Sequence, residues 1–201
     1  LQDHVPEFPA EEAVKTIESE TNQPIEKVFK SFSKKPIASA SIGQAHIGIL
    51  TSGRKVLVKV KRPDIDEKIQ QDLDIVKYIM GLFEKNHDLE FFDIKGIIQE
   101  VERFTKDELN FKKEASNINL FYKYNIDEKD IIAPKVHNNL TTRNLLVMDF
   151  IEGKTLNKIQ PPKKAIAKKI INSIFKQVFI DGFFHGDPHP GNIIVKGRKI
   201  A

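Results

Sequence analysis

The chain has 201 residues, of which 40% are hydrophobic, so it can bury a core and is too apolar to be disordered. It contains no cysteine, which excludes disulfides, thiolate metal sites and a cysteine nucleophile. The 32 basic and 28 acidic residues are interleaved rather than clustered, so we do not expect a nucleic-acid-binding protein. No run of about 18 apolar residues occurs, so we expect no membrane-spanning segment.

The first third of the chain predicts one helix followed by strands. Pro9 and the two glutamates after Ala10 are typical of a helix start. Residues 37–50, rich in alanine, serine and isoleucine, predict two short strands joined by a tight loop, and 51–54 form a hairpin-turn signal. In the strand predicted over 55–61, alternate valines share one face, opposite two lysines and a leucine.

The remaining pattern predicts helices and two hairpins. Helical periodicity covers residues 64–83 and 94–122, and a β-hairpin is expected over 131–150. An apolar helix over 165–180 is followed by a loop and by a hairpin over 193–201.

This order predicts an α+β, bilobal fold. We expect residues 1–151 to form a lobe of sheet and helices, and residues 152–201 to form part of a helical lobe. The connector Glu152–Lys154 is the expected hinge.

The strongest chemical signal is the segment from His185 to Asn192, which reads H-x-D-x-x-x-x-N, the spacing of a phosphotransferase catalytic loop. In such a loop Asp187 orients a substrate hydroxyl and accepts its proton, while Asn192 offers an amide oxygen to Mg²⁺. Two other interpretations stay open. The segment could be a tight structural loop, or a metal site of His185, Asp187 and His189.

Lys59 is a second signal, because it lies on an otherwise apolar strand. It could simply extend to solvent at a strand edge, or it could grip nucleotide phosphates with a helical glutamate as its partner. On the helix predicted over 94–122, steps of three and four residues place Glu108 among apolar neighbours, where an ionised carboxylate needs a cation. We therefore expect Glu108 to pair with Lys59.

A third signal is a stretch of small residues where a kinase has its glycine-rich loop. Small side chains allow backbone N–H groups to approach a phosphate. This stretch has one glycine where the usual loop has three, so the residues alone also allow a plain strand. The residues concerned are Ala38, Ser39, Ala40, Ser41, Gly43 and Gln44.

Together these segments resemble the UbiB family of atypical kinase-like proteins, also described as aarF-domain kinases. Residues 38–44 are similar to the family's alanine-rich loop, 58–63 to its lysine strand and 185–192 to its catalytic loop. Residues 108–115 are similar to its Glu-x-Asp motif and the glutamate that follows, here Glu114, which could belong to the site or form a pair on the helix surface. At position 110 the chain has Asn where the motif has Asp. The resemblance covers essentially the whole chain and implies a protein-kinase-like fold.

The resemblance also implies a function. It implies ATP and Mg²⁺ as cofactors, with residues 38–41, Gly43, Gln44, Lys59 and Glu108 at the nucleotide, Asp187 catalytic and Asn192 at the metal. It implies atypical kinase or ATPase activity that supports ubiquinone biosynthesis, with lipid or quinone-biosynthesis proteins as partners. The expected location is the cytoplasm or a membrane periphery.

Two motifs of the family are absent from the sequence. The N-terminal Lys-x-Gly-Gln motif has no match, and the Asp-Phe-Gly that supplies a Mg²⁺ ligand would follow Ala201. We therefore expect a segment of a longer protein that turns over nucleotide poorly without that aspartate. Two alternatives remain. They are a pseudokinase scaffold that binds nucleotide or lipid, and a small-molecule phosphotransferase.

Overall fold

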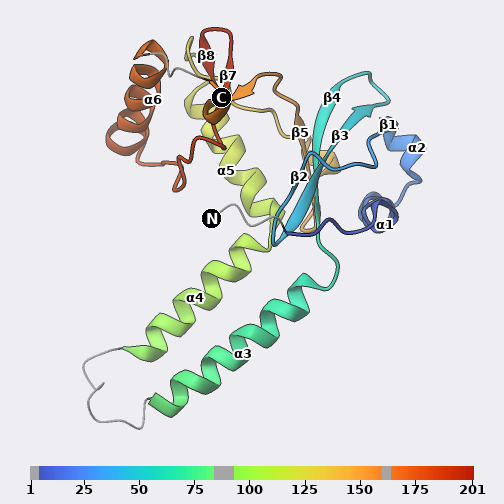
Figure 1. The fold of residues 1–201 in the computed structure, drawn as a ribbon, viewed down its shortest axis with the longest axis vertical. Helices are drawn as coiled ribbons and strands as arrows, with labels where there is room; N and C mark the ends of the chain where they lie inside the picture. The colour runs from blue at the N-terminus through green and yellow to red at the C-terminus, as the bar shows by residue number, and fades with distance from the viewer. Residues whose placement is uncertain (1–4, 84–92, 160–163) are drawn as a thin grey trace. The chain divides into compact units, whose positions relative to one another are not determined.

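The computed structural model describes residues 5–83, 93–159 and 164–201, and mixes helices and strands along the whole chain (Figure 1). The chain forms two compact units. The first runs to Glu114 and includes Asn138–Val147, and the second comprises Ala115–His137 and Met148–Ala201. The α+β class predicted from the sequence is confirmed. The lobe boundary expected at residue 151 remains a prediction.

The first unit is built on a five-stranded sheet. Its strands lie in the order β1-β3-β4-β5, and β2 pairs with one end of β3. The pairs β1–β3, β2–β3 and β3–β4 are antiparallel. The elements that start in this unit are α1 (Ala10–Thr21), α2 (Ile25–Val28), β1 (Phe29–Phe32), β2 (Ala38–Ser39), β3 (Gly43–Leu50), β4 (Lys55–Lys61), α3 (Ile65–Phe83), α4 (Ile94–Glu108), α5 (Phe111–Tyr124) and β5 (Leu145–Asp149).

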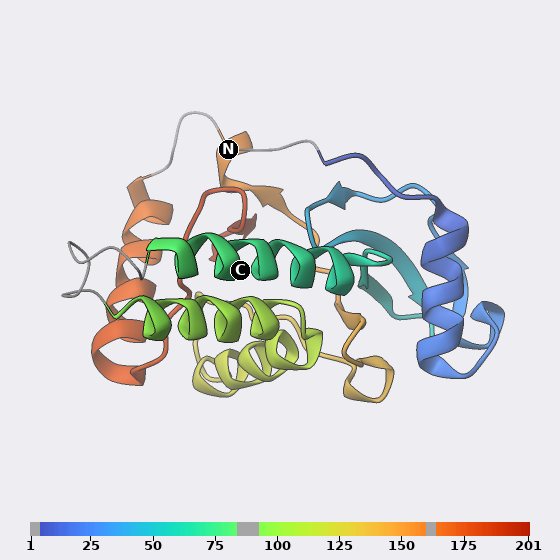
Figure 2. The same ribbon diagram turned by 90° about the horizontal axis from the view of Figure 1, so that it is seen from below.

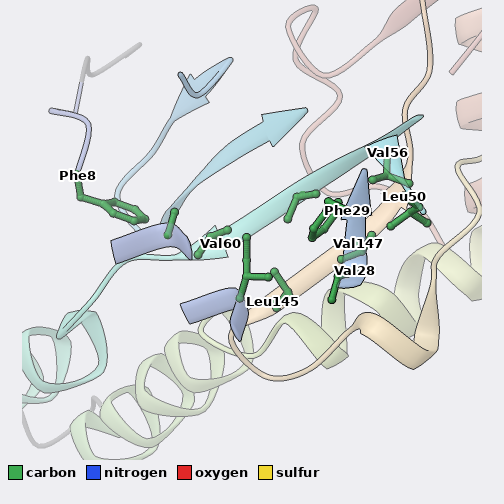
Figure 3. Close-up of a cluster of buried hydrophobic side chains, with 11 residues drawn as sticks. Phe8, Val28, Phe29, Leu50, Val56, Val60, Leu145 and Val147 are labelled. Carbon is green, nitrogen blue, oxygen red and sulfur yellow. The ribbon is translucent and has the colours of Figure 1, made fainter. Parts of the chain in front are cut away.

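The core of this unit lies on one face of the sheet, against the first helices. The alternate valines of β4, Val56, Val58 and Val60, are fully buried, as their period-two spacing predicts. They pack with Phe29, Leu145 and neighbouring apolar side chains (Figure 3). Residues from α1 and α2 complete the same cluster. Lys59 lies on the opposite face of β4, away from this core.

The predicted strands and turns of this unit are confirmed. The strands expected over 37–50 are β2 and β3, and the strand expected over 55–61 is β4. Gly53 in the turn between β3 and β4 has a φ of 84°, a conformation that glycine adopts without steric cost. The first helix begins at Ala10, directly after Pro9.

Helices α3 and α4 run side by side in both views (Figures 1 and 2). Lys77 of α3 and Glu102 of α4 form an ion pair of 2.8 Å between them. The helix predicted over 64–83 is confirmed as α3. The single helix predicted over 94–122 is wrong, because the chain is interrupted at Leu109 and Asn110 and continues as α5.

The hairpin predicted over 131–150 is only half correct. Its second arm is β5, but its first arm contributes a single bridge between Val136 and Met148. The turn region instead forms a short 3-10 helix over Asn138–Leu140. Pro134 cannot donate a backbone hydrogen bond, which hinders a continuous ladder in this arm.

The second unit joins one helix to a small antiparallel sheet. Helix α6 (Lys164–Lys176) continues as a π-helical turn over Gln177–Asp181 and ends at Gly182, as the sequence predicts. The sheet order is β6-β7-β8, and Ile166, Val195 and Ile200 form the core. The C-terminal hairpin predicted over 193–201 is confirmed as β7 (Ile194–Lys196) and β8 (Lys199–Ile200), and β6 (Lys154–Thr155) pairs with β7. Within the described ranges no helix is long and apolar enough to cross a membrane.

Candidate functional site

Lys59 is held by a glutamate on a helix. Its Nζ lies 2.8 Å from Oε1 and 2.7 Å from Oε2 of Glu114, so the ammonium contacts both carboxylate oxygens. The same Nζ lies 5.1 Å from the centre of the Phe111 ring. The two charged side chains are 33% and 37% exposed, so the pair is neither sealed from solvent nor freely solvated. An ammonium fixed in this way stays accessible to an anionic ligand.

The partner predicted for Lys59 is therefore wrong. Glu108 is exposed at the last position of α4, and it does not lie among buried apolar residues. Val101 and Phe104, which the periodic pattern placed beside it in the core, are exposed as well. The pattern fails because α4 ends at Glu108 and the helix is interrupted at Leu109 and Asn110 before α5 begins.

The start of α5 explains how Glu114 reaches Lys59. Asn110 accepts a hydrogen bond from the Lys112 N–H through Oδ1, at 3.1 Å, as a helix N-cap does. Leu109 and Phe111, on either side of it, are buried and anchor the turn. Glu114 lies one turn into the new helix, where a carboxylate also suits the positive end of the helix dipole.

The sheet register places the small-residue loop beside Lys59. Ala38 pairs with Ala45, and Ala45 pairs with Lys59, so the three residues form one row across β2, β3 and β4. Directly paired residues share a face of a sheet. The Ala45 methyl group therefore lies next to the Lys59 side chain, and the Ala38 methyl group lies one strand further along the same row.

The tip of this loop offers backbone donors. Ala40 N–H donates to Gly43 O at 2.8 Å, which closes the turn. Within the part of the chain that the structure describes, the N–H groups of Ser41 and Ile42 donate no hydrogen bond. Gly43 is required for packing, because a Cβ there would lie 2.4 Å from Val60 O.

Gln44 and Ser39 lie on the opposite face of the sheet from Ala38 and Lys59. Gln44 pairs with Val60 and with Ser39, so its side chain shares the core face of the sheet and not the face of Lys59. It is 1% exposed, and its amide is hydrogen-bonded to the backbone of Phe8. The structure thus places Ala38 on the same face of the sheet as Lys59, two strands away, and directs the Gln44 side chain to the opposite face.

In the second unit, Asp187 and Asn192 are in direct contact. Asn192 Nδ2 donates to Asp187 Oδ2 at 3.0 Å and to the Asp187 backbone oxygen at 3.3 Å. The Asn192 amide oxygen therefore faces away from the carboxylate. Asp187 Oδ1 accepts the His189 N–H at 3.3 Å, and every residue from His185 to Asn192 except Gly191 is exposed. A carboxylate and an amide oxygen are hard oxygen donors of the kind that Mg²⁺ takes.

Buried polar residues of α6 and its π-helical turn anchor this loop. Gln177 accepts the His185 N–H through Oε1 at 3.0 Å and donates through Nε2 to Ser173 Oγ at 3.0 Å. Both Ser173 and Gln177 are buried. His185 in turn accepts the Asp187 N–H through Nδ1, at 3.1 Å. This chain of bonds fixes the start of the loop to the helix.

The arrangement does not support a histidine-rich metal centre. Among residues 5–83, 93–159 and 164–201, no three His, Asp or Glu side chains converge on one point. His185 and His189 instead use their Nδ1 atoms to accept backbone N–H groups within the loop.

Comparison with known proteins identifies the family. Residues 1–200 match the ABC1 atypical kinase-like domain. The chain belongs to the ABC1 atypical kinase-like family. The resemblance to UbiB proteins is confirmed, since a probable protein kinase UbiB of Marinobacter nauticus is 36% identical over 97% of this chain.

Other similar proteins come from Clostridium pasteurianum and Arabidopsis thaliana. An uncharacterized protein in the hydrogenase 1 5' region of Clostridium pasteurianum is 38% identical over 90% of this chain. Protein ACTIVITY OF BC1 COMPLEX KINASE 3, chloroplastic, of Arabidopsis thaliana is 36% identical over 96%. The chain spans 37% of the Marinobacter protein, 36% of the Clostridium protein and 28% of the Arabidopsis protein.

A solved structure confirms the kinase-like fold of this ABC1 chain. The complex of Rv3197 with erythromycin from Mycobacterium tuberculosis matches with a TM-score of 0.82 and 27% identity. The match covers 97% of this chain and 50% of that one.

Proposed function

We propose that this chain is the nucleotide-binding part of an ABC1 kinase-like enzyme, in which Lys59 grips the phosphates of ATP and Glu114 orients Lys59. The observation that carries the proposal is the bidentate contact of Lys59 with Glu114 beside a loop of small residues. A half-exposed lysine with a fixed carboxylate is the arrangement that kinases use for the α- and β-phosphates.

The loop of residues 38–43 supports the same proposal. Its small side chains and the N–H groups of Ser41 and Ile42 fit a phosphate, which accepts hydrogen bonds from backbone donors. In the proposed site the loop covers the phosphates, as a glycine-rich loop does in other kinases. Glu108 has no part in the orientation of Lys59, because its carboxylate is exposed at the end of α4.

The catalytic loop supplies the proposed chemistry. Bound MgATP would supply the phosphoryl group and release ADP, with Asn192 as the oxygen donor toward the metal. Asp187 would hold an acceptor hydroxyl or water and take its proton, since Oδ1 and Oδ2 each keep a lone pair beside the bond shown. The acceptor can be a protein, a small molecule or water.

The proposed biological role is support of isoprenoid-quinone biosynthesis by the full-length protein. It rests on the UbiB relatives and on the implied role of that family. The test is the quinone content of cells that lack the protein and are complemented with wild type or Lys59→Ala. Equal quinone in uncomplemented and complemented cells would contradict this role and leave the nucleotide site standing.

Thermal melting of the full-length protein with and without MgATP tests the nucleotide site. A ligand at about 100 times its dissociation constant adds about 2.7 kcal/mol to the free energy of unfolding, which raises the midpoint by several degrees. We expect Lys59→Ala to abolish this shift and Lys55→Ala, on an exposed lysine of the same strand, to keep it. A shift that survives in Lys59→Ala contradicts the proposed grip.

A second candidate function is binding of a small organic ligand. It is favoured by the Mycobacterium tuberculosis relative, whose solved structure is a complex with erythromycin. The same melting experiment with erythromycin in place of MgATP tests it. A shift with erythromycin and none with MgATP would favour this function and a scaffold without phosphotransfer.

A further inference from the structure

The N-terminal segment Pro6–Phe8 is joined to the small-residue loop by two side chains. The first is Gln44, whose Oε1 accepts the Phe8 N–H and whose Nε2 donates to Phe8 O, both at 3.2 Å. The side-chain amide of Gln44 thus pairs with the Phe8 backbone in the same way as the backbone of a neighbouring strand would. It is sealed from water, because Gln44 is 1% and Phe8 is 8% exposed.

The second side chain is Arg62, directly after β4. Its Nη2 lies 2.9 Å from Pro6 O, 3.2 Å from Ser39 Oγ and 3.2 Å from Ala40 O. Its guanidinium also stands 5.3 Å from the centre of the Phe8 ring. One planar cation thus contacts both the N-terminal segment and the loop.

The backbone of Arg62 and the Ser39 hydroxyl add to the same connection. Arg62 N–H donates to Ile42 O at 2.8 Å, on the far side of the loop tip. Ser39 Oγ lies 3.4 Å from Pro6 O. The loop is therefore held at Ser39, Ala40 and Ile42, while the N–H groups of Ser41 and Ile42 donate no hydrogen bond to any residue that the structure describes.

We propose that Arg62 and Gln44 are positioning residues that couple the Pro6–Phe8 segment to the small-residue loop, so that this segment keeps the loop in its nucleotide-binding form. The inference rests on the proposed function, because it takes the loop as the phosphate-binding element. Neither residue contacts the nucleotide through its side chain in this proposal. Both act through the loop backbone.

The physical reason is preorganisation. A free hairpin tip of alanine, serine and glycine samples many conformations. Binding of a phosphate would restrict it to one of them, at a cost in conformational entropy. Contacts that already fix Ser39, Ala40 and Ile42 remove that cost before the ligand arrives. A lysine at position 62 keeps the charge but loses the planar fork and its stacking on Phe8, so it serves poorly as a replacement.

The direct test is the affinity of the full-length protein for MgATP in wild type, Arg62→Lys and Ser39→Ala. We expect Arg62→Lys to weaken binding about tenfold and Ser39→Ala, which removes one acceptor of Arg62, to weaken it about threefold. Arg103→Lys is the matched control, because Arg103 is an exposed arginine paired with Glu100 on α4, and it should bind as wild type does.

A second readout separates positioning from mere support of the fold. Coupling is reciprocal, so MgATP should slow hydrogen exchange at the Phe8 N–H in wild type and leave it unchanged in Arg62→Lys. Wild-type affinity in Arg62→Lys, or no change at Phe8 on binding, would overturn the inference while the proposed function stands. If the wild-type protein does not bind MgATP, both the inference and the proposed function are overturned. If Arg62→Lys does not fold, the affinity of Ser39→Ala provides the test.

Discussion

Lys59 of β4 and Glu114 of α5 are joined through both carboxylate oxygens, at 2.8 and 2.7 Å. Both side chains are about one-third exposed, so solvent screens the pair and its effect on the free energy of unfolding should be below about 1 kcal/mol. The contact is then better explained by function than by stability. The Glu114 carboxylate fixes the orientation of the Lys59 ammonium, for which the apolar neighbours on the strand offer no polar partner.

Replacement of Asp187 should separate binding from turnover. Asp187→Asn keeps a polar side chain of the same shape but cannot accept a proton, so MgATP affinity should stay near wild type while hydrolysis falls by about 100-fold or more. The measurement is phosphate release by the full-length protein beside a binding titration. Asp72→Asn, on an exposed position of α3, is the control and should change neither. Equal turnover in Asp187→Asn and wild type would remove Asp187 from the mechanism.

Asn110 should stabilise the start of α5 as an N-cap. Asn110→Ala removes the acceptor of the Lys112 N–H and should lower the free energy of unfolding by about 1 kcal/mol. Asn110→Asp keeps the acceptor and adds a charge favoured by the helix dipole, so it should be neutral or slightly stabilising. Denaturant unfolding measures both. An Asn110→Asp variant as unstable as Asn110→Ala would contradict the cap.

His46 should make the stability depend on pH. It is fully buried on β3, where its Nδ1 lies 2.8 Å from Ser33 O and its ring stacks on Phe32. Burial lowers the pKa of His46 below its ordinary value of 6.5, an effect larger than the opposing influence of the Ser33 contact and the Glu7 charge.

The sign of the effect follows from this lowered pKa. Above pH 6.5 the histidine is neutral in both states, and its contribution to stability is complete. As the pH falls below 6.5, the unfolded chain binds the proton first, so the free energy of unfolding decreases by at most about 1.4 kcal/mol per pH unit. Denaturant titrations of wild type and His46→Gln between pH 7 and 5 measure it. The same pH slope in both proteins would show that His46 does not contribute.

Two glycines should respond in opposite ways to alanine. In Gly43→Ala the new Cβ would lie 2.4 Å from Val60 O, so β3 and β4 must separate, at about 1–3 kcal/mol. In Gly81→Ala nothing lies within 4 Å, and the better helix propensity of alanine should stabilise α3 by about 0.5–1 kcal/mol. Thermal melting of both variants is the measurement. Destabilisation by Gly81→Ala would mean that its side of α3 is covered.

Much of this fold could be predicted from patterns of neighbouring residues in the sequence. The alternation of valines in β4, the glycine turn at Gly53 and the helix stop at Gly182 each depend on a few neighbouring residues, and the structure confirms them. The catalytic-loop spacing likewise brings Asp187 to Asn192 without long-range contacts.

The partner of Lys59 could not be predicted in this way, because it depends on a contact between distant residues. Both Glu108 and Glu114 fit helical steps of three and four residues, and periodicity alone cannot distinguish them. Asn110 was a usable signal, since an N-cap residue inside a predicted helix marks a possible second start. The clamp of Arg62 on Pro6 and the anchor of His185 on Gln177 had no local signal.

The measurement that tests the central claim most directly is a calorimetric titration of MgATP into the full-length protein and into two matched variants. Glu114→Gln removes the charge that orients Lys59, and Glu108→Gln removes the same charge six residues earlier in the sequence. We expect one binding site in wild type, an affinity about five- to tenfold lower in Glu114→Gln, and no change in Glu108→Gln. Equal affinities in all three proteins, or a loss confined to Glu108→Gln, would contradict the assignment of Lys59 and Glu114 as the phosphate grip.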